Sequence, residues 1–96
     1  MEILMNKRNF FFKIFGRVQG VGYRAWTKRL ADNLNFVGWV KNCNDGTVEI
    51  EIYCDEKKKN LFKEKCYRGP LLSKVDKIEE TCKSGKKFSK FEILIK

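Results

Sequence analysis

A glycine-rich segment followed directly by an arginine is the first feature of the sequence that could support chemistry. Residues 16–24 read GRVQGVGYR, with glycines at 16, 20 and 22. Glycine lets backbone N–H groups turn toward a ligand, and a helix that begins here adds the positive end of its dipole. The guanidinium of Arg24 supplies a bidentate fork for phosphate oxygens. From these residues alone, a cradle for one phosphate and a tight strand-to-helix turn beside a surface arginine explain the pattern about equally well.

Asn42 is the second candidate for a functional side chain. It ends an expected strand just before the turn formed by Asn44, Asp45 and Gly46. A neutral amide offers both a donor and an acceptor, which suits the holding of a water molecule. Turn chemistry explains the same residue, because Asn and Asp are common at hairpin ends. Taken alone, Asn42 is better explained by the turn.

The absence of one residue type excludes several mechanisms. The chain contains no His, which rules out His-based acid–base catalysis, Ser-His or Cys-His nucleophiles and His-ligated metals. Its cysteines, Cys43, Cys54, Cys66 and Cys82, include no CxxC pair. We expect reduced, structural thiols because the sequence contains no recognisable secretion signal. A single disulfide is the alternative.

Hydropathy periodicity indicates the elements that must position these residues. Strands are expected over residues 10–18, 36–42, 47–54, 74–82 and 88–95, and helices over residues 23–35 and from 55 or 56 to 67. The order is β-α-β-β-α-β with one extra short strand. It predicts an α+β, ferredoxin-like (split βαβ) two-layer sandwich, in which two helices cover one face of an antiparallel sheet of four to five strands.

The length and net charge of the chain limit its number of domains, its location and its partners. Residues 1–96 are expected to form a single domain, with residues 1–8 as a short N-terminal extension. No apolar run approaches the roughly 20 residues of a membrane span, and residues 1–8 lack the apolar region of a signal peptide. We therefore expect a cytoplasmic protein without a membrane partner. The net charge of +9 favours anionic partners, although a general excess of lysine explains it as well.

Aromatic residues in the expected strands suggest a nucleic-acid surface as an alternative. Five of them could stack bases on the open face of the sheet: Phe11, Phe12, Phe15, Trp39 and Tyr53. The sequence lacks the RNP1 pattern of RNA-binding domains with this fold. Packing in the core or on the sheet is the better explanation, so nucleic acid is not the expected partner.

Two segments of the sequence resemble the motifs of the acylphosphatase family. Residues 16–24 are similar to its signature GxVQGVxFR, and residues 38–49, GWVKNCNDGTVE, are similar to its second motif GxVxNxxDGxVE. Gly69, Pro70 and Val75 also fit the later part of the pattern. Tyr23 replaces the usual Phe, which keeps the ring and adds a hydroxyl. The resemblance extends from about residue 10 to residue 95.

This resemblance implies the same ferredoxin-like sandwich and a metal-independent hydrolysis of the carboxyl–phosphate bond of acyl phosphates. It implies no cofactor and no covalent intermediate. By position in the motifs, Arg24 would bind the phosphate and Asn42 would orient the attacking water. The loop backbone would complete the cradle at Gln19, Gly20, Val21, Gly22, Tyr23 and Arg24. The expected partners are a small-molecule acyl phosphate and inorganic phosphate or a similar anion, bound by a monomer. The alternative is an acylphosphatase-like basic module that binds nucleic acid or another anionic partner with little activity.

Overall fold

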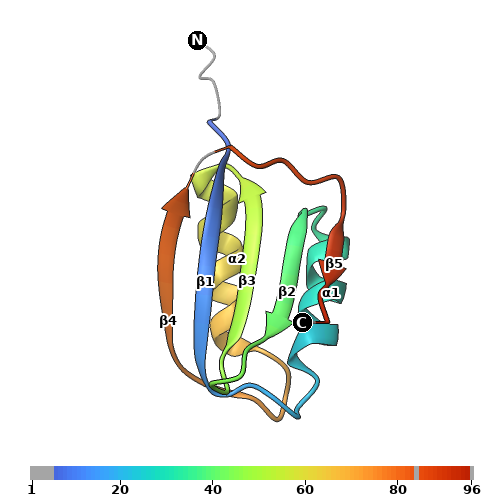
Figure 1. Cartoon of the computed structure of the whole chain (residues 1–96), viewed down its shortest axis with the longest axis vertical. Coiled ribbons are helices and arrows are strands. Elements are labelled where there is room, and N and C mark those ends of the chain that lie inside the picture. The colour runs from blue at the N-terminus through green and yellow to red at the C-terminus, as the bar shows by residue number, and fades with distance from the viewer. Residues whose placement is uncertain (1–5, 84, 96) are drawn as a thin grey trace.

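Five strands and two helices form two layers, with both helices on one face of the sheet (Figure 1). The computed structural model describes residues 6–83 and 85–95, so the expected N-terminal extension lies mostly outside the described residues. The elements are β1 (Arg8–Arg17), α1 (Tyr23–Asn33), β2 (Gly38–Asn42), β3 (Val48–Cys54), α2 (Glu56–Arg68), β4 (Lys74–Lys83) and β5 (Phe91–Ile93). The predicted ferredoxin-like two-layer sandwich is confirmed.

The strand order is β4-β1-β3-β2-β5, and its last pair corrects the expectation of a wholly antiparallel sheet. β5 runs parallel to β2, with Gly38 beside Phe91 and Val40 beside Ile93. The chain leaves β4 and crosses the end of the sheet at which β2 also begins (Figure 1). A strand that enters from this end must run in the same direction as β2. Hydropathy alternation carries no information on this choice of direction.

Several helices and strands are shorter than the hydropathy pattern predicts. Helix α1 ends at Asn33 rather than at residue 35, and Asn35 adopts a φ of 60°. Strand β2 begins at Gly38, whose φ is 144° and where a Cβ would lie 1.8 Å from the carbonyl oxygen of Glu51. The chain turns at residues 34–35, and its first bond to β3 runs from the N–H of Tyr53 to the carbonyl oxygen of Val37 at 3.2 Å.

The core lies between the sheet and the helices. On β1, Phe12 and Ile14 face the helices, and on β3 so does Ile50; all three are at most 1% exposed. The ring of Phe12 stacks on that of Phe62 in α2, with 6.2 Å between the centroids. Asp55 caps α2 as predicted, because its Oδ1 accepts a 2.8 Å hydrogen bond from the N–H of Lys58.

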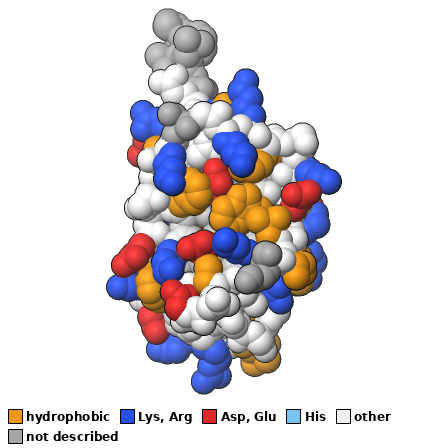
Figure 2. All heavy atoms as spheres, in the orientation of Figure 1, with side chains coloured by type: hydrophobic (Ala, Val, Ile, Leu, Met, Phe, Trp, Pro, Cys, Tyr) orange, Lys and Arg blue, Asp and Glu red, His pale blue; other side chains and the backbone are white. Residues whose placement is uncertain are grey.

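The open face of the sheet holds a half-buried group of aromatic side chains. Figure 2 views this face, where hydrophobic side chains gather over the middle of the sheet among lysines and arginines. The rings of Phe11 and Trp39 meet edge to face at 6.2 Å, and Trp39 Nε1 donates to the buried carboxylate of Glu51 at 2.8 Å. Phe12 is not part of this face, because strand alternation places it on the helix side. The expectation of packing in the core or on the sheet is therefore supported, with Phe12 in the core and Phe11 against Trp39 on the sheet.

All four cysteines are free, as expected. Cys54 and Cys66 are buried, and burial raises the pKa of each thiol to about 12, which keeps both protonated and unreactive. Within the described residues, neither helix is both long enough and apolar enough to cross a membrane.

Candidate active site

The loop between β1 and α1 depends on glycine for its backbone conformation. Gly20 has a φ of 77° and Gly22 a φ of 81°, the left-handed region that other residues avoid. A Cβ at either position would meet nothing within 4 Å. Glycine is therefore required here for the torsion angles and not for lack of room.

The N-terminus of α1 presents unpaired N–H groups at the end of this loop. Gly22 is the N-cap residue, with no side-chain capping bond, and the first turn contains no acidic residue. The first helical bond runs from the N–H of Trp26 to the carbonyl oxygen of Gly22 at 3.0 Å. The N–H groups of Tyr23, Arg24 and Ala25 consequently have no acceptor within the helix. Together with the dipole, they form a positive site suited to an anion.

A cavity of about 320 Å³ opens at this helix end and joins the two predicted site residues. Its walls are formed by Val18, Gln19, Gly20, Gly22, Tyr23, Arg24, Ala25, Asn42, Ile93 and Ile95. Arg24 and Asn42, 18 positions apart in the sequence, thus line one cavity. Val21 is the exception among the predicted loop residues, because its half-buried side chain packs against the core.

Asn42 lines this cavity and has one unsatisfied polar side-chain atom. It is the last residue of β2, and its Oδ1 is buried without a hydrogen-bond partner among the described residues. Buried acceptors without a donor are rare in folded proteins and call for an explanation. An amide that the fold leaves unpaired beside a cavity fits a residue whose partner is a bound molecule.

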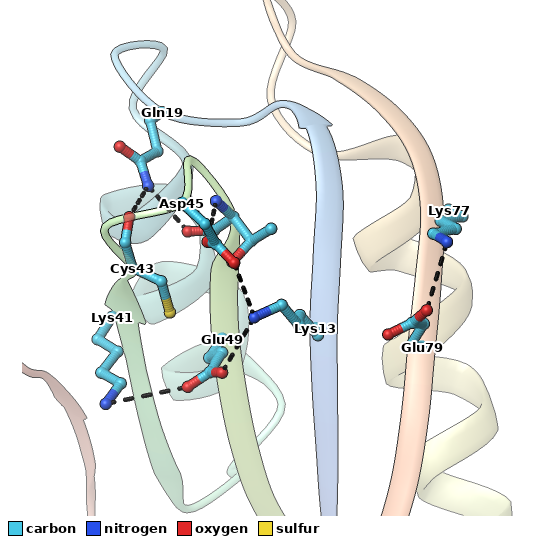
Figure 3. A network of polar contacts seen from close by, with 9 residues as sticks. Lys13, Gln19, Lys41, Cys43, Asp45, Glu49, Lys77 and Glu79 are labelled. Atoms are coloured by element: carbon cyan, nitrogen blue, oxygen red, sulfur yellow. Dashed lines mark hydrogen bonds and ion pairs between the residues drawn. The ribbon is translucent and has the colours of Figure 1, made fainter.

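The side chain of Gln19 ties the loop to the hairpin that follows Asn42 (Figure 3). Its Nε2 donates two hydrogen bonds, to the carbonyl oxygens of Cys43 and Thr47, each at 2.8 Å. From the sequence, Gln19 is expected to contribute only its backbone to the site. No sequence signal marks this contact, because it depends on the distance between two turns from different parts of the chain.

Ion pairs and hydrogen bonds hold the same hairpin on the open side of the sheet (Figure 3). Asp45 Oδ1 accepts bonds from the hydroxyl of Thr47 at 2.6 Å and from its N–H at 3.1 Å. Lys13 Nζ lies 3.0 Å from the other carboxylate oxygen and 3.7 Å from Glu49. Thr47, followed by Lys13, lowers the pKa of Asp45 to about 2. These contacts therefore stabilise the conformation of the turn after Asn42.

The tyrosine that departs from the family motif has its own partner. Tyr23 is 1% exposed, and its hydroxyl donates a 2.6 Å hydrogen bond to the carbonyl oxygen of Cys66 in the last turn of α2. Burial, above all, raises the pKa of this phenol. The added hydroxyl thus joins the start of α1 to the end of α2 and leaves the cavity unobstructed.

Comparison with known proteins places the chain in a family. The family model described as Acylphosphatase matches residues 10–93. An acylphosphatase of Synechococcus sp. is 44% identical over 68 residues, which cover 71% of this chain and 58% of that protein. An acylphosphatase of Clostridium acetobutylicum is 42% identical over 69 residues, covering 72% and 76%. The chain therefore belongs to the acylphosphatase family, and the predicted class of hydrolase is confirmed at the family level.

Solved structures agree with this assignment. The crystal structure of acylphosphatase from Bacillus subtilis superposes with a TM-score of 0.87 at 36% identity, covering 92% of this chain and 99% of that one. Full-length HypF, in its phosphate- and nucleotide-bound form, gives a TM-score of 0.81 at 27% identity. That match covers 98% of this chain but 12% of HypF, so a domain of this shape also occurs within a much longer protein.

Proposed function

We propose that the protein hydrolyses acyl phosphates to a carboxylate and inorganic phosphate, with Arg24 and Asn42 as its catalytic residues. The observation that carries the proposal is that Arg24, the unpaired N–H groups of α1 and the amide of Asn42 line the same cavity. An anion cradle and a group able to hold water are the two components that this hydrolysis needs.

Arg24 would bind the phosphoryl oxygens through its fork of N–H donors. Its guanidinium makes no ion pair or side-chain hydrogen bond with any described residue, so it is available to a substrate. The backbone of Gln19, Gly20, Val21, Gly22 and Tyr23 would complete the cradle. Charge that develops on the phosphoryl oxygens during transfer would be stabilised by donors already in place.

Asn42 would orient the attacking water. The water oxygen forms a bond to phosphorus while the bond from phosphorus to the acyl oxygen breaks, and the electron pair leaves with the carboxylate. A phosphate oxygen of the substrate accepts the proton, so the protein needs neither a His nor a strong general base. A carboxylate is a good leaving group, and positioning with charge stabilisation therefore suffices. No step in this scheme requires a metal or another cofactor.

We also propose that the enzyme acts as a monomer in the cytoplasm. Every group in the scheme comes from one chain, so a monomer would suffice. Four free cysteines, two of them buried, fit a reducing compartment such as the cytoplasm. Inorganic phosphate, as a product that fits the cradle, is expected to inhibit competitively.

One observation supports the alternative of a basic, nucleic-acid-binding module. Lysine ammonium groups lie over aromatic rings on the open face, Lys83 over Phe11 at 4.8 Å and Lys77 over Phe15 at 4.7 Å. Binding of random single-stranded oligonucleotides at low salt, weakening steeply as salt is added, would favour this alternative. No binding at low salt would discard it.

Hydrolysis of benzoyl phosphate, followed by ultraviolet absorbance in the presence of a chelator, tests the proposed function. We expect rapid turnover that phosphate inhibits competitively. A folded protein, with a cooperative unfolding transition, that leaves benzoyl phosphate and acetyl phosphate untouched would overturn the proposal.

A further inference from the structure

A second cavity, of about 230 Å³, lies at the end of the sheet opposite the candidate active site. Lys7 lines this cavity and directly precedes β1, whereas the loop of the candidate active site follows the other end of β1 (Figure 1). A strand of 10 residues is about 30 Å long, so the two cavities are separate. We call the second cavity the distal pocket; its walls include Lys7, Asn35, Tyr53, Asp55, Lys58 and Lys87.

Three lysines from separate parts of the chain line the distal pocket. Lys7 precedes β1, Lys58 lies in the first turn of α2, and Lys87 lies in the segment between β4 and β5. None of them makes an ion pair with a described residue, whereas the neighbouring Lys59 is paired with Glu80 at 3.0 Å. Like charges repel one another, so the pocket favours a ligand that carries several negative charges.

Carboxylates do not balance the charge of these three lysines. Asp55 is the one acidic residue among the described residues that line the distal pocket, and its Oδ1 already accepts the 2.8 Å capping bond from the N–H of Lys58. Glu2 is the one acidic side chain of the sequence outside the described residues. Lysines would outnumber carboxylates at the pocket even with Glu2 counted, so its net charge is positive.

Two neutral side chains add hydrogen-bond donors to the same walls. The hydroxyl of Tyr53 and the amide of Asn35 make no hydrogen bond within the described residues. The ring of Tyr53 lies under the ammonium group of Lys7, with 6.0 Å between Nζ and the ring centroid. This cation–π contact keeps Lys7 at the pocket wall. Charged and neutral donors therefore surround the same space.

We propose that the distal pocket binds a small oligophosphate, an anion with two or three linked phosphate groups. Lysine binds phosphate as a point charge, and several lysines in one pocket match the several charges of such an anion. A volume of about 230 Å³ is below the range of pockets that enclose drug-sized ligands, which favours a compact anion. Inorganic tripolyphosphate and the triphosphate group of a nucleotide share this chemistry. The distal pocket and the catalytic cavity have no lining residue in common, so the inference is independent of the proposed function.

Titration of the ¹⁵N-labelled protein with inorganic tripolyphosphate, followed by amide chemical shifts, tests the location of the site. We expect the amide signals of residues 35–37, 53–58 and 86–88 to move with a Kd of about 1 mM or below at low salt. Added salt should weaken binding, because it screens charges near the surface. Movement confined to residues 19–25 would overturn the inference, since tripolyphosphate would then bind only in the candidate active site. No movement at about 10 mM tripolyphosphate would overturn it as well.

Removal of charge from the distal pocket tests the lysines. The triple variant Lys7→Gln, Lys58→Gln and Lys87→Gln should weaken tripolyphosphate binding by at least about tenfold. The matched control is Lys57→Gln, Lys65→Gln and Lys83→Gln, which loses the same charge at lysines outside the pocket and should stay within about twofold of the wild type. Equal weakening in the two triple variants would overturn the inference, because the net charge would then explain binding. If the first triple variant does not fold, Lys87→Gln alone should weaken binding by about two- to fivefold, and an unchanged Kd would count against the site.

A nucleoside triphosphate distinguishes the two sources of the oligophosphate. A Kd equal to that of inorganic tripolyphosphate assigns the site to the phosphate chain alone. A Kd lower by about fivefold or more would show that the base adds a contact, for which the ring of Tyr53 is available. The hydrolysis of benzoyl phosphate is measured separately: a protein that binds tripolyphosphate at residues 53–58 without turnover would refute the proposed function and leave this inference standing.

Discussion

Gln19 and Cys43 are joined by a 2.8 Å hydrogen bond from the side-chain Nε2 of Gln19 to the carbonyl oxygen of Cys43. Cys43 directly follows Asn42, and Gln19 belongs to the loop that leads to Arg24 (Figure 3). A single side chain thus connects the proposed phosphate cradle to the residue proposed to hold water. Small errors in the placement of reacting groups are costly in catalysis, so we regard Gln19 as a positioning residue.

Replacing Gln19 with Met keeps the length of the side chain and removes both of its hydrogen bonds. We expect kcat for benzoyl phosphate to fall by about tenfold or more with a smaller change in KM, because the water and the phosphate are no longer held in register. The free energy of unfolding should fall by about 1–3 kcal/mol, since two carbonyl oxygens lose a donor. A folded Gln19→Met enzyme with the wild-type kcat would show that the tether plays no part in turnover.

Replacing Tyr23 with Phe restores the usual residue of the family motif. The variant loses the hydrogen bond from the hydroxyl to the carbonyl oxygen of Cys66, and we expect the free energy of unfolding to fall by about 1 kcal/mol. Urea denaturation measures this change. Tyr53→Phe serves as the control, because the hydroxyl of Tyr53 makes no hydrogen bond within the described residues. Equal effects of the two substitutions would contradict a specific role for the Tyr23 hydroxyl.

Replacing Gly22 with Ala tests the left-handed conformation of the loop. There is room for the Cβ, so the cost is that of the backbone angles, about 1–2 kcal/mol. Part of this strain should be relieved by movement of the loop, which weakens inhibition by inorganic phosphate. Gly85→Ala is the control, since Gly85 also has a positive φ and open space but lies away from the cavity. Unchanged phosphate inhibition in Gly22→Ala would separate the loop conformation from anion binding.

Asp45 is expected to contribute to the acid stability of the hairpin. Its carboxyl has a pKa of about 2 in the folded protein, against an ordinary value of 3.8. Because the folded pKa is the lower one, the stabilisation is present above pH 3.8 and is lost as the pH falls toward 2. Urea midpoints measured across this range should fall more steeply for the wild type than for Asp45→Asn. Parallel curves would show that Asp45 is not coupled to folding.

The parts of the fold that local chemistry determines could be predicted from the sequence. Asp55 begins α2 by capping it, and the turn containing Asp45 and Gly46 closes the hairpin between β2 and β3. The direction of β5 could not be predicted, because it depends on where the preceding chain crosses the sheet. Strand β5 also contains only three residues, fewer than the apolar run of residues 88–95 indicated.

The candidate site also has parts that the sequence indicated and parts that it did not. The types and spacing of Arg24, Asn42 and the loop glycines left turn chemistry as an equal or better explanation, and the resemblance to the family motifs is what implied their roles. The structure places Arg24 and Asn42 in one cavity. The side-chain role of Gln19 was missed because it arises only when two turns meet. The sequence did not indicate that Ile93 and Ile95 line this cavity, because apolar residues near the end of a strand indicate packing, and the cavity forms only when β5 pairs with β2.

We propose that Arg24 and Asn42 act on a substrate bound in this cavity. The most direct test of this proposal is the rate of benzoyl phosphate hydrolysis, with a chelator present, by the wild type, Arg24→Lys and Asn42→Ala. The matched controls are Arg29→Lys, on the exposed side of α1, and Asn44→Ala, in the exposed turn. We predict that Arg24→Lys loses at least about 100-fold in kcat/KM and that Asn42→Ala loses a similar factor mainly in kcat, while both controls match the wild type. Wild-type rates in folded Arg24→Lys and Asn42→Ala proteins would contradict the account.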